Sequence, residues 1–389
     1  MKRFLCLFTS VLLLWTACQK PDPVPVPKPV PVVEEPELYE LKDLASMTLH
    51  EKIGQLFCIA PESVTDATGY VTAGYPEFRE RFEKYPCGGF ILLAGNIKNP
   101  SQIQQFNRYL HELGNYPFIC VDEEGGSVAR IANNSNFSVI KYSSMGAVGA
   151  TGDKRNAFNA GSTIGSYLYR YRFDVDLAPV ADVNTNPENV VIGNRSFGSD
   201  PGLVADMVGE FLNGLQDSKV EGCLKHFPGH GDTKADSHYG YAETLKTWEE
   251  IAACEMVPFR KGIEEGARLI MTAHISAPNV TGSSVPSTLS PLMLTEKLRG
   301  ELGYKGLIIT DALGMGASTQ EYGPGDAAIQ AILAGVDILL TPENYEAAYD
   351  NVEAAVKAGT IPVSRIEESA ARVLALKKDI LKARGMLAE

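Results

Sequence analysis

The stretch Gly306-Leu307-Ile308-Ile309-Thr310, followed at once by Asp311, is a short apolar run that begins at a glycine and ends in a charge. Its polarity does not alternate, which is typical of a strand covered on both faces, as in a parallel sheet. A segment with the length and pattern of a helix precedes it at 291–302, and another follows at 326–333. This order of elements indicates an α/β fold with parallel strands.

The same alternation recurs from about residue 40 onward. Strands are predicted at Leu56–Ala60, Gly88–Leu93, Phe118–Asp122, Val175–Val180, Cys223–His226, Leu269–Thr272, Gly306–Thr310 and Asp337–Leu340. Helices are predicted at 101–113, 155–169, 203–215, 248–263, 291–302, 326–333, 343–357 and 363–383. Eight such pairs in about 340 residues predict a (β/α)8 barrel in a single catalytic domain, with a doubly wound open sheet as the alternative.

The N-terminus has the pattern of a secretory signal peptide. A basic start, Met1-Lys2-Arg3, precedes an apolar run from Phe4 to Trp15 that is too short to span a bilayer comfortably. The end of this run resembles the lipobox of bacterial lipoproteins, in which the cysteine is lipidated and becomes the mature N-terminus. Trp15 departs from that pattern, which usually has an aliphatic residue there. We therefore expect a signal peptide at 1–17 and lipidation of Cys18, with a plain cleaved signal as the alternative.

Residues 18–39 contain many prolines and favour an extended polyproline conformation. We expect this segment to be a linker between the lipidated cysteine and the catalytic domain at 40–389, although a disordered tail would have the same composition. The expected location is extracytoplasmic, with the chain anchored to a membrane through Cys18. Whether it faces the periplasm or the cell surface stays open, as does its oligomeric state.

The charge, the cysteines and the glycine motifs argue against a nucleic-acid partner, a disulfide framework and a nucleotide cofactor, respectively. The formal net charge is −13, which argues against a nucleic-acid partner because such proteins need basic patches. Without Cys6 and Cys18, five cysteines remain, and an odd number without close spacing does not indicate a disulfide framework. Neither Gly125-Gly126 nor Gly229-His230-Gly231 completes a nucleotide-binding motif, and no cofactor is expected.

Polar residues follow most of the predicted strands, where a barrel places its chemistry. They are Asp122 to Gly126 after the third strand, Asp182 and Asn184 after the fourth, Lys225 and His226 at the end of the fifth, His274 after the sixth and Asp311 after the seventh. His226 and His230 are spaced like a helical zinc pair. Pro228 and two glycines break a helix there, so no metal is expected.

Two residues in these loops could act directly on a substrate. His238 follows Asp236 by two residues, and a nearby carboxylate can orient an imidazole and raise its pKa, as a general acid/base requires. A solvated pair on a loop is the simpler interpretation. Asp311, at the mouth of the barrel, could attack an anomeric carbon or could merely cap the next helix.

Five segments together resemble glycoside hydrolase family 3. They are Phe118 to Gly126 with Arg130, which is similar to the signature D-x-E-G-G-x-V-x-R; Asn194-Arg195-Ser196-Phe197-Gly198; Lys225 to Thr233, which is close to K-H-F-P-G-H-G-x-T; Asp236-Ser237-His238; and Ile309 to Met315. The fourth segment resembles the β-N-acetylglucosaminidase branch alone. The chain ends near its last predicted helix, as in single-domain members, and Ala312 and Gly314 replace residues that are often Asp and Ser.

The resemblance implies a retaining exo-β-N-acetylglucosaminidase (β-N-acetylhexosaminidase) that acts on terminal β-linked N-acetylglucosamine of peptidoglycan fragments or chitooligosaccharides. Asp311 would be the nucleophile, and His238 with Asp236 the acid/base. The residues that match sugar-binding positions are Asp122, Arg130, Arg195, Lys225 and His226. The alternatives are phosphorolysis at the same site, β-glucosidase activity and a non-catalytic glycan-binding lipoprotein.

Overall fold

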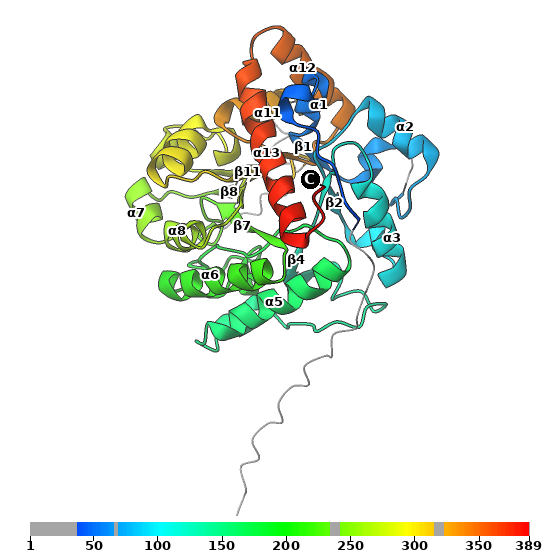
Figure 1. Cartoon of the computed structure of the whole chain (residues 1–389). Coiled ribbons are helices and arrows are strands. Elements are labelled where there is room, and N and C mark those ends of the chain that lie inside the picture. The colour runs from blue at the N-terminus through cyan, green and yellow to red at the C-terminus, as the bar shows by residue number, and fades with distance from the viewer. Residues whose placement is uncertain (1–36, 66–68, 234–241, 315–322, 389) are drawn as a thin grey trace, which may run out of the picture. The chain divides into compact units, whose positions relative to one another are not determined.

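The structure is a computed structural model, and it describes residues 37–65, 69–233, 242–314 and 323–388. Within these residues, eight parallel strands form the main sheet (Figure 1). They are β1 (Phe57–Ile59), β2 (Gly89–Leu92), β3 (Phe118–Val121), β6 (Val175–Asp176), β7 (Glu221–Phe227), β9 (Leu269–Thr272), β11 (Leu307–Thr310) and β12 (Leu339–Leu340). Their order is β11-β9-β7-β6-β3-β2-β1-β12. A parallel bridge between Ile309 and Ile338 joins the two end strands and closes the barrel.

This closed sheet confirms the predicted (β/α)8 barrel and excludes the open doubly wound sheet. All eight predicted strands are present. The fourth is shorter than expected, because β6 covers only two residues and Val180 then pairs with Lys225 as an isolated bridge. The fifth is longer, since β7 extends from Glu221 to Phe227.

Helices surround the barrel and connect successive strands (Figure 1). The α-helices of the described residues are α1 (Leu49–Gly54), α2 (Pro76–Lys84), α3 (Pro100–His111), α4 (Met145–Gly149), α5 (Arg155–Arg170), α6 (Pro201–Asp217), α7 (Trp248–Ala253), α8 (Met256–Glu264), α9 (Pro278–Thr281), α11 (Pro324–Ala334), α12 (Tyr345–Lys357) and α13 (Val363–Arg384). A π-helix, η6, covers Leu292–Glu301. Short 3-10 turns are η1 (Leu44–Ser46), η2 (Pro61–Val64), η3 (Ala94–Asn96), η4 (Gly193–Arg195) and η5 (Ser287–Leu289). Minor strands are β4 (Glu123–Gly125), β5 (Val128–Ala129), β8 (Ala242–Glu243) and β10 (Ile275–Ser276).

Several helices differ from the sequence prediction, and the short helices α1, α4 and α9 are not among the predicted ones. The helix α2 follows β1 and is not among the predicted helices, although Phe78 and Phe82, four residues apart, form its buried face. The predicted helix 248–263 is divided into α7 and α8. Pro258 explains the break, because in a continuous helix its ring would clash with the carbonyl four residues earlier and it has no N–H to donate.

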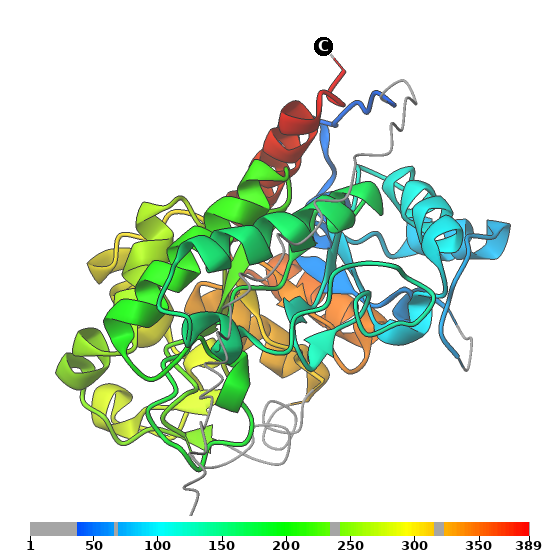
Figure 2. The ribbon, with the colours of Figure 1, turned by 90° about the horizontal axis from the view of Figure 1, so that it is seen from below.

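The inside of the barrel is apolar, and α13 covers one end of it. Val373, Leu376 and Ile380 of α13 pack against the side chains that fill the barrel interior. In Figure 1, α13 (red) passes in front of the strands, and Figure 2, turned by 90°, shows it at one end of the barrel. Arg268, directly before β9, forms an ion pair with Asp379 of α13, so the covered end is the N-terminal end of the strands.

Two buried carboxylates hold α13 in place at the N-terminal end of the barrel through ion pairs and hydrogen bonds. Asp337, before β12, lies within ion-pair distance of Arg299, Arg365 and Arg372, and it accepts a hydrogen bond of 2.7 Å from the hydroxyl of Ser369. The second carboxylate is Asp174, which lies before β6. It accepts hydrogen bonds from Arg384 at 2.7 Å, His111 at 2.8 Å and Tyr116 at 3.2 Å. Full pairing of this kind is what keeps a buried charge tolerable.

The first described residues join the same end of the barrel. Tyr39 N–H donates to the carbonyl of Met386 at 2.8 Å, and Ala388 N–H donates to the carbonyl of Tyr39 at 3.0 Å. Because Met386 lies two residues after the end of α13, Tyr39 lies beside the end of that helix.

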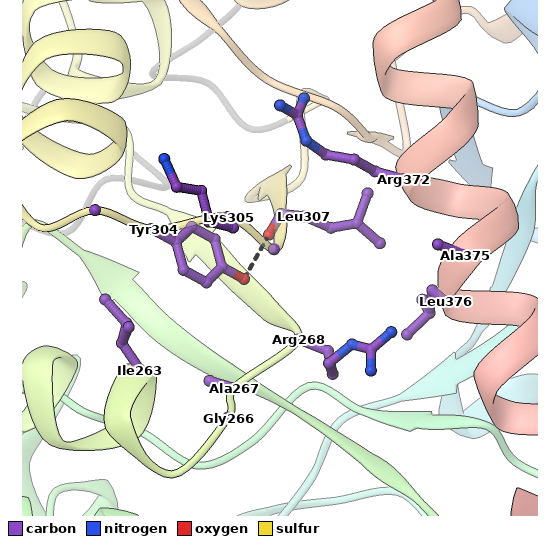
Figure 3. Close-up of a pocket in the computed structure, with 12 residues that line it drawn as sticks. Ile263, Gly266, Ala267, Arg268, Tyr304, Lys305, Leu307, Arg372, Ala375 and Leu376 are labelled. Atoms are coloured by element: carbon purple, nitrogen blue, oxygen red, sulfur yellow. Dashed lines mark hydrogen bonds between the residues drawn. The ribbon is translucent and has the colours of Figure 1, made fainter.

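A cavity of about 420 Å³ also lies at the N-terminal end (Figure 3). Arg268 and Lys305, which precede β9 and β11, line it together with Arg372 and Leu376 of α13. The hydroxyl of Tyr304, another lining residue, donates to the carbonyl of Leu307 at 3.1 Å. This cavity is therefore at the opposite end of the strands from the loops in which barrel enzymes carry their chemistry.

Lys377 of α13 is completely buried at this end, with 0% of its surface exposed. Its Nζ donates to Gln55 Oε1 at 2.6 Å and to the carbonyl of Asn115 at 3.0 Å. Burial lowers the pKa of the amine from 10.5 to about 7. A neutral amine still has two N–H groups for these two acceptors.

We predict that Lys377 makes stability depend on pH. Its pKa is lower in the folded than in the unfolded chain, so between about pH 7 and 10.5 the unfolded chain binds more protons, and the free energy of unfolding rises with pH by up to about 1.4 kcal/mol per unit. Urea unfolding of the wild type and Lys377→Met at pH 6, 7.5 and 9 measures this. As pH rises, the free energy of unfolding of the wild type should increase relative to that of Lys377→Met. A difference that stays constant with pH would show that Lys377 is charged in the folded chain.

Candidate active site

The predicted sugar-binding residues and Asp311 all lie at the C-terminal ends of the strands. Asp122 directly follows β3, Asp311 directly follows β11, and Lys225 and His226 belong to the last three residues of β7. Arg130 follows β5, and Arg195 ends η4. Three other predicted residues, Cys18, Asp236 and His238, lie outside the described residues.

Arg130, Asp122, Lys225, Glu124 and Arg195 form one continuous chain of ion pairs. The Lys225 ammonium lies 2.8 Å from Asp122 Oδ1 and 2.6 Å from Glu124 Oε1. Arg195 donates two hydrogen bonds to Glu124, of 2.8 and 2.7 Å. Arg130 donates to Asp122 Oδ2 at 3.2 Å. Four predicted sugar-binding residues are thus brought together, and Glu124, to which the sequence analysis assigned no role, connects two of them.

Lys225 and Glu124 are buried, the other three side chains are half-buried, and both carboxylates and Lys225 remain charged. Burial raises the pKa of Glu124, but Lys225 and Arg195 outweigh it, and the pKa falls to about 2. Burial likewise raises the pKa of Asp122, and Lys225 and Arg130 bring it below its usual value. Burial lowers the pKa of Lys225, while the two carboxylates raise it more. Three cations and two carboxylates give the cluster a net charge of +1 and a set of oriented donors and acceptors suited to hydroxyl and amide groups.

Asp182, which follows β6, holds the next group of residues. Its Oδ2 accepts from His226 Nδ1 at 2.7 Å, and its Oδ1 accepts from the backbone N–H groups of His226 at 3.2 Å and His230 at 2.7 Å. Burial raises the pKa of Asp182, but His226 outweighs it and the pKa is lowered. An ionised carboxylate only accepts, so Nδ1 of His226 carries a proton and Nε2 is the nitrogen available to a ligand. Asp182 was noted in the sequence only as one of the polar residues after a strand.

An irregularity in β7 lets two consecutive side chains serve the site. The pairing register between β7 and β9 shifts between Leu224 and Phe227. In a regular strand, Lys225 and His226 would point to opposite faces. Here Lys225 reaches the carboxylates after β3, and His226 reaches the carboxylate after β6. The peptide bond between Lys225 and His226 is cis.

Asp311 is a carboxylate that is ionised at neutral pH. Its Oδ1 accepts from the N–H of Ala312 at 2.8 Å. Burial raises its pKa, but His226, His274, this N–H and Lys225 together lower it below its usual value. His274 donates from Nε2 to the carbonyl of Ala312 at 3.1 Å, which places this imidazole beside the same turn. An ionised carboxylate is suited to nucleophilic attack and poorly suited to proton donation.

The alternative role of Asp311, as a helix cap, has no support in the described residues. The next described helix, α11, begins at Pro324, and its N-cap is Gly323. Asp311 Oδ1 instead accepts from the N–H of its direct neighbour.

A closed barrel that carries an ionised carboxylate and a chain of ion pairs at the C-terminal ends of its strands is compatible with a glycoside hydrolase. The family model "Glycosyl hydrolase family 3 N terminal domain" matches residues 48–376. The chain therefore belongs to glycosyl hydrolase family 3, and the predicted family resemblance is confirmed.

Several relatives match most of the chain. Beta-hexosaminidase A of Pseudoalteromonas piscicida is 33% identical over 349 residues, which are 83% of this chain and 58% of that protein. Beta-hexosaminidase LpqI of Mycobacterium tuberculosis is 30% identical over 355 residues, 86% of this chain and 84% of that protein. The solved structure of a family 3 β-N-acetylglucosaminidase from Paenibacillus sp. FPU-7 has a TM-score of 0.81 and 36% identity, and the match covers 88% of this chain and 64% of that one.

We predict that Glu124→Gln lowers the free energy of unfolding by about 3 kcal/mol, because it leaves two buried cations without full compensation. Urea unfolding at pH 7 measures the change. Glu368→Gln is the matched control, since Glu368 also pairs with an arginine, Arg372, at 2.5 Å, but its side chain is 53% exposed. The control should stay within about 0.5 kcal/mol of the wild type. Equal losses of stability in the two variants would show that the charge of Glu124 contributes no more to stability than the charge of an exposed carboxylate.

Proposed function

We propose that this chain is a retaining exo-β-N-acetylglucosaminidase that hydrolyses terminal β-linked N-acetylglucosamine through a covalent glycosyl-enzyme. The observation that carries the proposal is the ionised Asp311, positioned with His226 and Lys225 at the C-terminal end of the barrel. The names of the relatives support the sugar: they are β-hexosaminidases and a β-N-acetylglucosaminidase. Peptidoglycan fragments and chitooligosaccharides are the substrates proposed.

The proposed reaction begins with attack by Asp311 on the anomeric carbon. The Ala312 N–H, which donates to Oδ1, orients the carboxylate. The glycosidic oxygen leaves with a proton from the acid/base. In the second step, water attacks the same carbon from the side that the leaving group vacated, and Asp311 is released.

His238 is the proposed acid/base, and Asp236 is its proposed partner. The sequence motif Asp236-Ser237-His238 supports this assignment. A carboxylate beside the imidazole favours one tautomer and stabilises the imidazolium form, so the ring can donate and then recover a proton.

Asp122, Arg130, Arg195, Lys225 and His226 are proposed to bind the sugar. In the ion-pair chain, Asp122 provides a carboxylate acceptor and Lys225 an ammonium donor, so a sugar hydroxyl next to this pair could contact both groups. His226 presents Nε2, because Nδ1 is held by Asp182. The side chain of Arg195 is only 17% exposed, and its guanidinium donates two hydrogen bonds to Glu124, which suits a fixed contact to a carbonyl such as that of an N-acetyl group.

Phosphorolysis is the second candidate, because the same site would need only to accept phosphate instead of water. The net charge of +1 on the ion-pair chain favours the binding of phosphate. An imidazole acid/base, neutral or cationic, would also repel phosphate less than a carboxylate acid/base would. The product distinguishes the two reactions.

The proposed location is extracytoplasmic, with residues 1–17 as a signal peptide, a lipid anchor at Cys18, a Pro-rich linker to residue 39 and the catalytic domain at 40–389. Among the described residues, no helix has both the length and the apolar character to cross a membrane. Tyr39 joins the body at the end of the barrel opposite the candidate site.

We predict that the mature protein releases the chromophore from an aryl β-N-acetylglucosaminide and that Asp311→Ala reduces turnover roughly 10³-fold or more, as loss of a nucleophile does. Asp350→Ala, which removes an exposed carboxylate on α12, is the control and should match the wild type. Product analysis with and without phosphate should show free N-acetylglucosamine in both cases. A sugar 1-phosphate would establish phosphorolysis, and full activity in Asp311→Ala would refute the nucleophile.

We predict that Cys18→Ser moves the protein from the membrane fraction to the soluble fraction of an expressing bacterium, because serine cannot take the lipid. Fractionation followed by immunoblotting measures this, and metabolic labelling with a fatty acid reports lipidation directly. Cys6→Ser is the matched control and should leave both results unchanged. Unaltered membrane association of Cys18→Ser would contradict the proposed anchor.

A further inference from the structure

His274 lies two residues after the end of β9, and its imidazole reaches the turn that carries Asp311. Its Nε2 donates to the carbonyl of Ala312 at 3.1 Å, and the residue is only 1% exposed. We propose that His274 is a positioning residue, which holds this carbonyl and thereby fixes the direction in which the Asp311 carboxylate points. This inference rests on the proposed function, in which Asp311 is the nucleophile.

The backbone next to Asp311 sets the orientation of its carboxylate. The N–H of Asp311 donates to the carbonyl of Thr272, the last residue of β9, at 3.0 Å. The N–H of Ala312 donates to Asp311 Oδ1 at 2.8 Å. Because of this second contact, the carboxylate moves together with the peptide group between residues 311 and 312.

Beyond this peptide group, two backbone hydrogen bonds attach the turn to the end of β12. The N–H of Leu313 donates to the carbonyl of Leu340, the last residue of β12, at 2.9 Å. The N–H of Gly314 donates to the carbonyl of Thr341 at 3.0 Å. Both contacts come from one side of β11, because β12 and β9 neighbour it on opposite sides.

His274 provides a contact from the β9 side. The carbonyl of Ala312 that it holds belongs to the peptide group directly after the one that orients Asp311. With His274 in place, residues 312–314 are held from both sides of β11. Without it, the described hydrogen bonds of these residues to the barrel would all come from the β12 side, and the turn could tilt about them.

The imidazole of His274 is itself held in one orientation. Its Nδ1 lies 3.1 Å from the hydroxyl of Thr288, which is completely buried. The same hydroxyl donates to the carbonyl of Ala273 at 3.0 Å and lies 2.9 Å from Thr272 Oγ1. The carbonyl of Ala312 can only accept, so Nε2 carries a proton. Thr288 therefore fixes the ring in the orientation that the contact with Ala312 requires.

The position of the carboxylate matters because nucleophilic attack requires reacting atoms about 3 to 3.5 Å apart and in line. A displacement of about 1 Å can reduce the rate about 10²-fold. The proposed sugar-binding residues are held by other groups, since their ion pairs and hydrogen bonds run through Asp122, Glu124 and Asp182. Loss of the His274 contact should therefore slow the attack and leave the affinity for the sugar unchanged.

Two amide variants separate this contact from the charge of the imidazole. In His274→Gln, the amide nitrogen can take the place of Nε2 and still donate to Ala312, whereas the shorter side chain of His274→Asn reaches only the place of Nδ1. Burial raises the pKa of Asp311, and His274, with His226 and Lys225, lowers it. Both variants lose the imidazole, so a difference between them reports the contact with Ala312.

The experiment measures kcat/KM of the full chain for an aryl β-N-acetylglucosaminide at pH 7. We expect it to fall about 10²-fold in His274→Asn and less than about 5-fold in His274→Gln. Thr288→Val, which leaves the imidazole without its contact at Nδ1, should lose about 5-fold. The Kd of N-acetylglucosamine, measured by calorimetry, should stay within about 2-fold of the wild type in all three variants.

Two matched controls lose similar groups that do not contact the turn. Ser287→Ala removes a hydroxyl of the same element, η5, that is 1% exposed and donates to the carbonyl of Ile275 at 2.8 Å. His50→Asn removes an imidazole whose Nε2 lies 3.0 Å from the carbonyl of Lys84, in α1, before the first strand. Both should keep the kcat/KM of the wild type, and circular dichroism checks that every variant is folded.

Equal losses in His274→Asn and His274→Gln, or no loss in either, would refute the positioning role while leaving the proposed function intact. A Kd of N-acetylglucosamine that weakens as much as kcat/KM falls would also refute it, because His274 would then act on binding. If His274→Asn does not fold, the comparison of Thr288→Val with Ser287→Ala decides in the same way. A wild type that does not cleave the substrate, or full activity in Asp311→Ala, would refute the proposed function and this role with it.

Discussion

The rest of the site depends on the ammonium group of Lys225, which lies between Asp122 and Glu124 at 2.8 and 2.6 Å with only 3% of its side chain exposed. An ammonium buried to this degree without partners would cost several kcal/mol. Both carboxylates follow β3, whereas Lys225 lies in β7, so the pairing forms only when β3, β6 and β7 lie side by side. Arg195 and Arg130 then attach to the same carboxylates. The proposed sugar-binding groups are thus assembled as a unit when these three strands lie side by side.

The two ends of the barrel use buried charge for different purposes. At the N-terminal end, Asp337 and Asp174 are surrounded by arginines, a serine, a tyrosine and a histidine, and these contacts hold α13 across the strands. At the C-terminal end, the chain from Arg130 to Arg195 keeps a net charge of +1, and Asp311 remains ionised beside it. The first end stabilises the fold, and the second can bind and act on a ligand, which is the usual division in such barrels.

Much of the fold could be predicted from the sequence, because continuous apolar runs such as 306–310 and glycine junctions are local signals. The helix α2 was missed although Phe78 and Phe82 marked its buried face. The partners in the site could not be predicted in the same way. Lys225 and Asp122 are 103 residues apart, and Arg195 and Glu124 are 71 residues apart. Only the folded barrel shows that these pairs meet.

The proposed covalent bond between Asp311 and the anomeric carbon can be trapped. The protein would be treated with a fluorinated N-acetylglucosamine derivative that has an activated leaving group, because the fluorine slows release of the glycosyl-enzyme. Peptide mass spectrometry should then find the added sugar on the peptide that contains Asp311, and Asp311→Asn should show no adduct. An adduct on another carboxylate, or release of a product with inverted configuration, would contradict the account.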